Sequence, residues 1–418
     1  MTKIDIVFLG VAVVIWIALI YNLFLMYHGY RYFIELNNMK EGYLDNMNEF
    51  PMVSIMIPCH NEETVIEQTM IAISSFDYPK DKLKIIVIND NSSDNTRGVF
   101  EKFKKTKGRE NFIMVDTTKE AGGKGKAGAL NFGMQFTEGD YIAVYDADNT
   151  PEPLALRYLV KTIVDGNYGA VVGKFRTRNK RKNLLTEMIN IEGLSFQWLA
   201  QGGRWHFFNL STIPGTNYII SKKCLQDVGG FDPKAIAEDT EISIKLYKIG
   251  KKIRFMPLAV TWEQEPETLK VFVKQRIRWI KGNLYVIFKY WTENPFHKNN
   301  AYYIDIVNFF MVYILFLFSV LLSHTIFLCN LLFGIELTIN GNINLIWLLT
   351  FVLYVLQVAN TLSFEKGELN RRSFFLIILS YFTYTQLWLY LAIISLYQFT
   401  KDSILKREVK WYKTERFQ

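Results

Sequence analysis

The chain is 418 residues long, which exceeds one compact domain, so we expect a domain of roughly 250 residues and a separate segment. Apolar residues make up 50% of it and gather at both ends, which predicts a membrane protein with a soluble middle. The net charge of +8 suits an anionic surface or substrate, but no base-reading motif accompanies it, so we expect no nucleic-acid partner.

The first element in chain order is a long apolar segment. Residues 6–26 are apolar apart from Asn22, and this length is sufficient to cross a bilayer core of about 30 Å. The segment is too long for the core of a signal peptide, and no small-residue cleavage pattern follows it. We therefore expect a retained transmembrane anchor within residues 1–30.

Strand-like and helical segments alternate in the next unit, residues 48–296. Short apolar runs predict strands at residues 52–57, 84–89, 112–115, 141–145 and 253–257. Helical stretches between the strands imply a mostly parallel sheet that is covered on both faces. The fold class expected for this unit is therefore α/β and Rossmann-like.

Polar side chains stand where three of these strands end. Glu62 follows the first strand, Asp90 the second, and Asp146 and Asp148 the fourth. Turn chemistry explains any one of them, but ligands bind beyond the carboxyl ends of parallel strands, and three such ends together favour a site. Asp146 and Asp148, one residue apart, can turn toward one Mg²⁺ or Mn²⁺ ion and the phosphates that it carries.

Further polar groups lie between and after these strands. A Gly-rich stretch around Lys126 lacks both the Walker and the dinucleotide spacing, but it can hold phosphate through backbone N–H groups and the ammonium. Glu238 and Asp239 stand at the start of a predicted helix, where acidic residues are also common simply because they stabilise the helix N-terminus. A basic helix is predicted later in the chain. Its positions i, i+3 and i+4 share one face, and they carry Gln275, Arg278 and Trp279. Such a helix can also simply lie on lipid.

Residues 302–400 carry further apolar segments, at 306–333, 345–362 and 374–399. The connector 338–343 has no Lys or Arg, which by the positive-inside rule places it outside and the α/β domain in the cytosol. Four full spans would leave the basic tail, residues 401–418, outside. We therefore expect segment 374–399 to be re-entrant or interfacial.

These motifs resemble the membrane-embedded processive family 2 glycosyltransferases, namely cellulose, hyaluronan, chitin and poly-N-acetylglucosamine synthases. The resemblance covers residues 52–282. Gln275-Arg-Ile-Arg-Trp279 matches the Q-x-x-R-W motif, and Asp146-Ala-Asp148 matches the D-x-D motif. Glu238-Asp239 matches the end of the T-E-D motif, although Ala237 replaces its Thr, and Ile213-Pro-Gly-Thr216 resembles the F-x-G-[ST] segment less closely.

The resemblance implies a GT-A fold and an inverting, processive transfer from a UDP-sugar to a growing glycan. It assigns Asp239 as the general base, with Glu238 beside it, and Asp146 and Asp148 as ligands of Mg²⁺ or Mn²⁺. The residues that it implies for the UDP-sugar donor are Glu62, Asp90, Lys126, Asp146, Gln275 and Arg278. The residues that it implies for the acceptor are Gly215, Thr216 and Trp279.

The resemblance further implies a multi-pass protein of the plasma (inner) membrane, whose C-terminal helices contact lipid and form a glycan channel. Its candidate lining residues are Tyr302, Tyr303, Asn308, Tyr313, Gln357, Tyr381, Tyr384, Gln386 and Trp388. Accessory export subunits are compatible with this reading. The motif context looks nearest to cellulose-synthase-like chains and favours UDP-glucose and a β-glucan product.

Other functions remain open from the sequence. A poly-N-acetylglucosamine or hyaluronan synthase would carry the same motifs. A non-processive enzyme that glycosylates polyprenyl phosphate would share the D-x-D domain without needing Q-x-x-R-W. A nucleotide-binding transporter or scaffold would not need a carboxylate such as Asp239 beside the metal pair.

Overall fold

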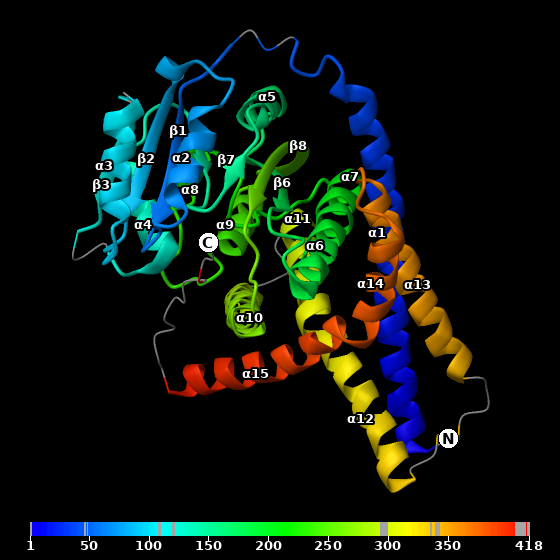
Figure 1. Ribbon diagram of the computed structural model, residues 1–418. Coiled ribbons are helices and arrows are strands. Elements are labelled where there is room, and N and C mark those ends of the chain that lie inside the picture. Colours follow the sequence, from blue (N-terminus) through cyan, green and yellow to red (C-terminus); the bar gives the residue numbers. More distant parts are fainter. Residues whose placement is uncertain are drawn as a thin grey trace.

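The computed structural model describes residues 2–45, 47, 49–107, 110–118, 122–292, 300–334, 337–338, 343–405 and 415. An α/β domain occupies one part of the molecule, and long apolar helices extend from it on one side (Figure 1). Most of the basic tail lies outside the described residues.

An eight-stranded sheet forms the centre of the α/β domain, in the order β3-β2-β1-β4-β7-β6-β8-β5. Its strands are β1 (Val53–Cys59), β2 (Leu83–Asn89), β3 (Phe112–Asp116), β4 (Tyr141–Val144), β5 (Thr150–Pro151), β6 (Ala170–Thr177), β7 (Tyr218–Ser221) and β8 (Ile253–Glu263). All of them except β5 and β7 run in the same direction. The expectation of a mostly parallel sheet is confirmed.

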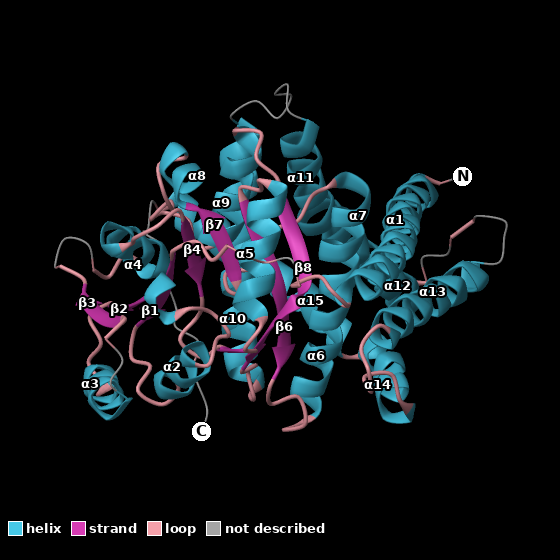
Figure 2. Ribbon diagram, turned by 90° about the horizontal axis from the view of Figure 1, so that it is seen from above, coloured by secondary structure: helices cyan, strands magenta, loops and turns pink. Residues whose placement is uncertain are grey.

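Helices cover both faces of this sheet (Figure 2). They are α2 (Ile66–Ser74), α3 (Thr96–Lys107), α4 (Gly125–Gly133), α5 (Ala155–Gly166), α6 (Leu184–Phe196), the π-helix η3 (Gln197–Gly203), α7 (Arg204–Phe208), α8 (Lys222–Asp227), α9 (Glu238–Lys248) and α10 (Leu269–Thr292). Because both faces are covered, the central strands read as continuous apolar runs. Ile55, Met56 and Ile57 of β1 are all fully buried.

Helix α1 (Lys3–Lys40) joins the two parts of the molecule. Thr2 and Asp5 form a capping box at its start. Its first half exposes apolar side chains, whereas its second half packs on the α/β domain, where the Tyr32 hydroxyl donates to the carbonyl oxygen of Phe255. The helix therefore continues ten residues beyond the expected anchor, because its C-terminal half is buried against protein.

The remaining helices are α11 (Asn300–Phe310), the π-helix η4 (Met311–Phe316), α12 (Leu317–Phe333), α13 (Ile343–Ser363), α14 (Arg371–Phe382) and α15 (Tyr384–Ile404). Within the described residues, 4 helical segments are long and apolar enough to cross a membrane: Lys3–Lys40, Ile306–Asn330, Leu345–Ser363 and Arg371–Ile404. The last is broken at Thr383, between α14 and α15. Helix α15 lies across the direction of α1 and α12 (Figure 1).

Polar contacts hold both ends of the apolar helices α1, α12 and α13. At the end far from the sheet, the Asp5 carboxylate accepts from the backbone N–H of Thr338 (2.9 Å) and from its hydroxyl. At the other end, the loop between α13 and α14 docks on β6, where Glu365 pairs with Lys174 (2.6 Å) and Glu368 pairs with Arg176. Helix α13 thus returns toward the α/β domain.

Candidate active site

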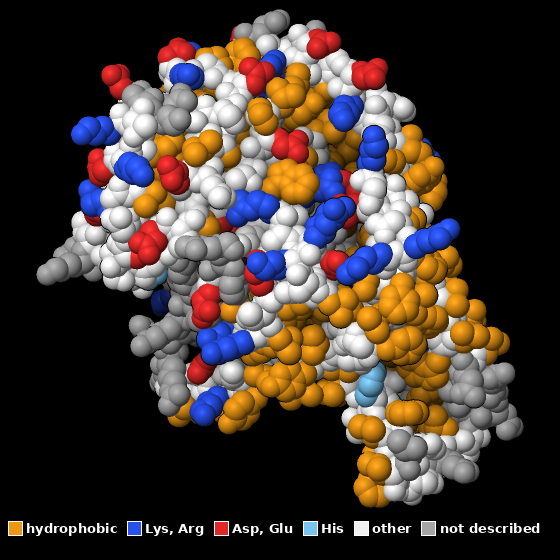
Figure 3. Space-filling model, in the orientation of Figure 1, with side chains coloured by type: hydrophobic (Ala, Val, Ile, Leu, Met, Phe, Trp, Pro, Cys, Tyr) orange, Lys and Arg blue, Asp and Glu red, His pale blue; other side chains and the backbone are white. Residues whose placement is uncertain are grey.

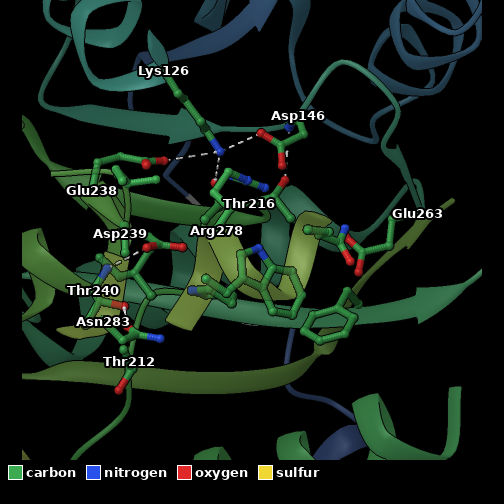
Figure 4. Close-up of a pocket in the computed structure, with 18 of the residues that line it drawn as sticks. Lys126, Asp146, Thr212, Thr216, Glu238, Asp239, Thr240, Glu263, Arg278 and Asn283 are labelled. Atoms are coloured by element: carbon green, nitrogen blue, oxygen red, sulfur yellow. Dashed lines mark hydrogen bonds and ion pairs between the residues drawn. The ribbon is translucent and has the colours of Figure 1, made fainter. Parts of the chain in front are cut away.

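A cavity of about 430 Å³ opens at the carboxyl ends of the central strands. Every residue that the sequence analysis assigned to a site lines it: Glu62, Asp90, Lys126, Asp146, Asp148, Gly215, Thr216, Glu238, Asp239, Gln275, Arg278 and Trp279. Figure 4 shows several of them around the cavity. Residues that lie more than two hundred positions apart in the chain therefore share one enclosure.

The topology of the sheet explains this convergence. Strands β1, β2 and β4 are parallel, so the residues that follow them meet at one edge. Strand β7 is antiparallel to β4, so the residues that precede it, Gly215 and Thr216, reach the same edge. Helix α9 then places Glu238 and Asp239 at its first turn, facing that edge.

Lys126 lies at the centre of a cluster of carboxylates (Figure 4). Its ammonium is 2.5 Å from Asp146 Oδ1 and 3.6 Å from Glu238 Oε1, and it donates to the carbonyl oxygen of Gly215 (2.6 Å). Burial by itself would lower the pKa of Lys126, but the surrounding carboxylates, Asp146 foremost, outweigh burial and raise it. The ammonium therefore remains charged and links the D-x-D loop to α9.

Glu238 and Asp239 have perturbed acidity. Burial raises the pKa of Glu238 to about 7, against the opposing effect of Lys126. Burial also raises the pKa of Asp239, and the positive charges of Lys126 and Arg278 oppose that rise. Asp239 Oδ1 accepts from the backbone N–H of Thr240 at 2.7 Å. A carboxyl with the raised pKa of Glu238 holds or releases a proton near neutral pH, and raised pKa values in a cavity are typical of acid–base sites.

Thr216 supports the loop that carries the D-x-D motif. Its hydroxyl donates to Asn149 Oδ1 and accepts from the backbone N–H of Asp146 at 3.0 Å. The residue is 3% exposed. Thr216 therefore fixes the backbone at Asp146, a contact that the sequence did not indicate.

Gly215 lies where any side chain would collide with the acidic pair. Its φ is +95°, in the region that favours glycine, and a Cβ there would lie 2.8 Å from Asp239 Oδ2. This close approach lets the backbone carbonyl of Gly215 reach Lys126 while its Cα faces Asp239.

Asp90 and Glu62 form another wall of the cavity. Asp90 Oδ1 accepts from the Thr117 hydroxyl and from the backbone N–H of Gly123, each at 2.9 Å. Glu62 is 7% exposed, and its backbone N–H donates to the Thr96 hydroxyl at 2.8 Å. These bonds hold the two loops after β1 and β2 against each other and against the Gly-rich stretch.

Helix α10 brings the Q-x-x-R-W residues to the opposite wall. The side-chain carbonyl oxygen of Gln275 is buried, and none of the described residues donates a hydrogen bond to it. Trp279 is 39% exposed and presents its ring to the cavity. Lys289 bonds Glu241 of α9 at 2.7 Å, so α9 and α10 hold the acidic pair and the motif in a fixed relation.

The donor set suits a divalent cation that the substrate helps to bind. Among the described residues, no group of three or more His, Cys, Asp or Glu side chains could hold a metal by itself. Asp146 and Asp148, one residue apart on the same loop, both line the cavity, and Asp146 Oδ1 also pairs with Lys126. Mg²⁺ commonly takes one or two carboxylates and completes its shell with water and substrate phosphate. These two residues therefore fit such an ion.

The cavity is also lined by two acidic residues and one glutamine that the sequence analysis missed. Glu263, Gln264 and Glu265 line it at the end of β8, and the backbone N–H of Gln264 donates to Asp148 Oδ2 at 3.4 Å. Acidic residues at the end of a strand would have indicated this part of the site. They were overlooked because the strand was expected to end at Pro257, whereas β8 continues to Glu263.

At its other end the cavity reaches the apolar helices. Asn308 and Phe309 of α11, Val312 of η4 and Trp388 of α15 line it together with the residues above. Asn308, Phe309 and Val312 belong to the candidate membrane span Ile306–Asn330. One continuous space thus connects the carboxylate cluster with a segment that is apolar enough to cross a bilayer.

Comparisons with known proteins agree with this geometry. A family model described as "Glycosyltransferase like family 2" matches residues 51–282. The chain is 48% identical over 405 residues, 96% of each protein, to a probable glycosyltransferase, YdaM, of Bacillus subtilis (strain 168). It is 33% identical over 278 residues, 65% of each protein, to the poly-beta-1,6-N-acetyl-D-glucosamine synthase of Staphylococcus aureus (strain COL).

A solved structure shares the fold. The mannosyltransferase of Pyrobaculum calidifontis in complex with GDP-Man and Mn²⁺ superposes with a TM-score of 0.59 at 18% identity, over 89% of this chain and 97% of that one. The α/β domain therefore has the expected GT-A fold, and it contains almost all of the cavity residues. The chain belongs to glycosyltransferase family 2.

Proposed function

We propose that the protein is an inverting, processive glycosyltransferase that extends a glycan from a UDP-sugar and passes the product into the membrane. The continuous cavity carries this proposal, because it joins the D-x-D carboxylates to Asn308 and Val312 of a candidate membrane span. An enzyme that adds a single sugar to a soluble acceptor does not need such an extension. The Q-x-x-R-W motif on the cavity wall supports the same conclusion.

Asp239 acts as the general base in this proposal. Its carboxylate takes the proton of the acceptor hydroxyl while that oxygen attacks C1 of the donor sugar. The bond between C1 and the diphosphate oxygen breaks, UDP leaves, and the configuration at C1 inverts. Glu238 begins the same helix, and, in addition to burial, the negative charge of Asp239 contributes to the raised pKa of Glu238.

The departing diphosphate develops negative charge, which the cationic side of the cavity stabilises. Lys126 and Arg278 provide fixed positive charge there. A bound divalent cation, held by Asp146 and Asp148, would supply further electrostatic stabilisation of the leaving group. Gln275 offers its buried amide to the donor, and the exposed ring of Trp279 offers an apolar face to the acceptor sugar.

The identity of the donor sugar is the most specific part of the proposal. The motif context favoured UDP-glucose, whereas the similarity to a poly-beta-1,6-N-acetyl-D-glucosamine synthase supports UDP-N-acetylglucosamine. We place UDP-N-acetylglucosamine first, because that relationship extends over 65% of the chain. UDP-glucose is the competing donor.

Three crossings of the inner membrane account for the helical part: α1, α11–η4–α12, and α13. The contact of Asp5 with Thr338 supports one common end for α1 and α12, and the docking of Glu365 on Lys174 supports the return of α13 to the cytosolic side. Lys and Arg side chains gather along the border between the domain and the apolar helices (Figure 3), where anionic headgroups would lie. Helix α15 then lies at the cytosolic surface, which leaves the basic tail in the cytosol.

The direct test is UDP release by the purified protein in detergent with Mg²⁺ or Mn²⁺, with UDP-N-acetylglucosamine, UDP-glucose and UDP-glucuronate offered separately. We expect UDP release together with a high-molecular-weight product that a linkage-specific glycosidase degrades. Sugar transfer to added polyprenyl phosphate without polymer would contradict processivity. An absence of turnover with every donor would favour a nucleotide-binding scaffold.

A further inference from the structure

Arg276 occupies the second position of the Q-x-x-R-W segment, where the motif leaves the residue open. It is 3% exposed, although it lines the cavity. Its guanidinium carbon lies 4.0 Å from the centre of the Trp279 ring. On a helix, residues three positions apart are neighbours, so this stacking follows from the register of α10.

Two other helices hold the guanidinium in this place. Its Nη2 donates to Glu192 Oε2 of α6 at 2.7 Å, and the Tyr384 hydroxyl of α15 donates to the same oxygen at 2.6 Å. The Tyr384 ring packs on Phe272 of α10, with ring centres 5.5 Å apart. Glu192 Oε2 therefore connects Tyr384 of α15 to the Arg276 guanidinium that stacks on Trp279.

We infer that Arg276 is a positioning residue that holds the Trp279 ring in the cavity wall, and that Glu192 and Tyr384 hold Arg276. This inference rests on the proposed function, in which Trp279 offers its face to the acceptor sugar. A planar guanidinium can stack on the indole and bond a carboxylate at once, whereas a lysine ammonium provides no flat surface. The orientation of the acceptor platform thereby depends on α15, the helix at the membrane surface.

The test compares elongation with donor hydrolysis in four forms of the full-length protein: wild type, Arg276→Lys, Trp279→Ala and the double variant. Arg276→Lys should lower sugar incorporation into polymer by about tenfold, as expected for losing a desolvated cation–π contact. Hydrolysis of the donor by water should stay within about twofold, because the donor side of the cavity is intact. In the Trp279→Ala background, Arg276→Lys should have no further effect on elongation.

A matched control is available in the same domain. Arg254 of β8 is another arginine stacked on aromatic rings, 5.4 Å from Trp205 and 5.7 Å from Tyr168; unlike Arg276 it is only partly buried, and it does not line the cavity. Arg254→Lys should leave the ratio of elongation to hydrolysis unchanged. A change in that ratio equal to that of Arg276→Lys would assign the effect to general loosening and overturn the inference.

Tyr384→Phe provides a milder variant, since it keeps the ring against Phe272 and removes only the hydroxyl. We expect a smaller fall in the same ratio, and no added effect on top of Arg276→Lys. Independent, multiplying effects of Arg276→Lys and Trp279→Ala would overturn the inference while leaving the proposed function in place. A wild-type protein that makes no polymer would instead overturn the proposed function, and this inference with it.

Discussion

Among single residues, Asp239 is the one that we propose takes the proton of the acceptor hydroxyl. Replacement of Asp239 by Asn should lower UDP release with acceptor present by about 10²- to 10⁴-fold, the usual contribution of a general base. Binding of UDP should be retained, because Lys126, Asp146 and Arg278 are untouched. Titration calorimetry and a UDP-release assay would measure the two effects.

The control for this substitution is Asp227→Asn, at an exposed position at the end of α8. It makes the same chemical change away from the cavity and should leave turnover unaltered. Near-native turnover of Asp239→Asn would remove Asp239 from the mechanism.

The acidity of the pair gives a prediction about pH. Burial raises the pKa of Glu238 to about 7 and also raises that of Asp239, so kcat/KM should rise with pH at a higher pH than an ordinary aspartate base would give. Lys126 lowers the pKa of both carboxyls. Lys126→Met should therefore move the rising limb to higher pH, whereas Lys223→Met, on the exposed surface, should not. A limb that stays in place or moves to lower pH would contradict this assignment.

Gly215 tests the close approach between the loop before β7 and α9. Gly215→Ala must place a methyl group 2.8 Å from Asp239 Oδ2 at a φ of +95°. Gly229→Ala is the matched control, because its φ is +75° but no atom lies within 4 Å of the added Cβ. Both should lose about 1 kcal/mol of stability from backbone strain, but only Gly215→Ala should also lose most of its turnover.

At the scale of elements, the loop between α13 and α14 holds the helical part on the sheet. Glu365 is 6% exposed, pairs with Lys174 and accepts from Trp198 Nε1 at 3.1 Å. Glu365→Gln leaves the Lys174 charge buried without its counter-charge and should destabilise the protein by about 3–5 kcal/mol. Thermal unfolding in detergent would measure the loss.

The surface pair of Glu187 and Arg372 is the control for that measurement. Glu187 of α6 pairs with Arg372 of α14, with 2.9 Å between Arg372 Nε and Glu187 Oε2. This pair also joins the α/β domain to α14, but Arg372 is 73% exposed. Glu187→Gln should change stability by at most about 1 kcal/mol. Equal losses from the two substitutions would show that the loop is not anchored through Glu365.

The sequence predicted β1, β2, β3, β4 and the first part of β8, and it missed β5, β6 and β7. Strand β7 has only four residues, and β8 contains Pro257, which argued for an end. In the structure Val172 pairs with Phe255 while Lys174 pairs with Val260, so residues 256–259 of β8, which include Pro257, form an irregularity opposite Gly173, and the strand continues beyond it. Register irregularities of this kind depend on a partner strand that sequence reasoning had not identified.

The site was predictable to a greater extent than the sheet, because motif residues at strand ends must meet once the strands are parallel. The supporting contacts were not predictable. The acceptor role of Thr216 stays a prediction, but nothing in the sequence indicated that its hydroxyl bonds Asn149 and the backbone of Asp146. The break at Thr383 falls within segment 374–399, and the re-entrant or interfacial placement of that segment stays a prediction.

For the whole molecule, the arrangement of helices predicts on which side of the membrane each loop lies. In a variant without native cysteines, Phe333→Cys at the end of α12 should react with an impermeant thiol reagent in intact cells. Lys366→Cys, beside the docking loop, should react only after the cells are permeabilised. Both positions are exposed, so accessibility to the reagent depends on the side of the membrane. Labelling of both positions in intact cells would contradict the proposed topology.

The most direct test of a continuous path from the carboxylate cluster into the membrane is the size of the product early in the reaction. The protein, reconstituted in vesicles with UDP-N-acetylglucosamine or UDP-glucose, should yield long chains while nearly all of the donor remains, because the cavity retains the growing end between additions. Products that lengthen uniformly from single sugars, or one sugar attached to a lipid, would contradict a processive enzyme.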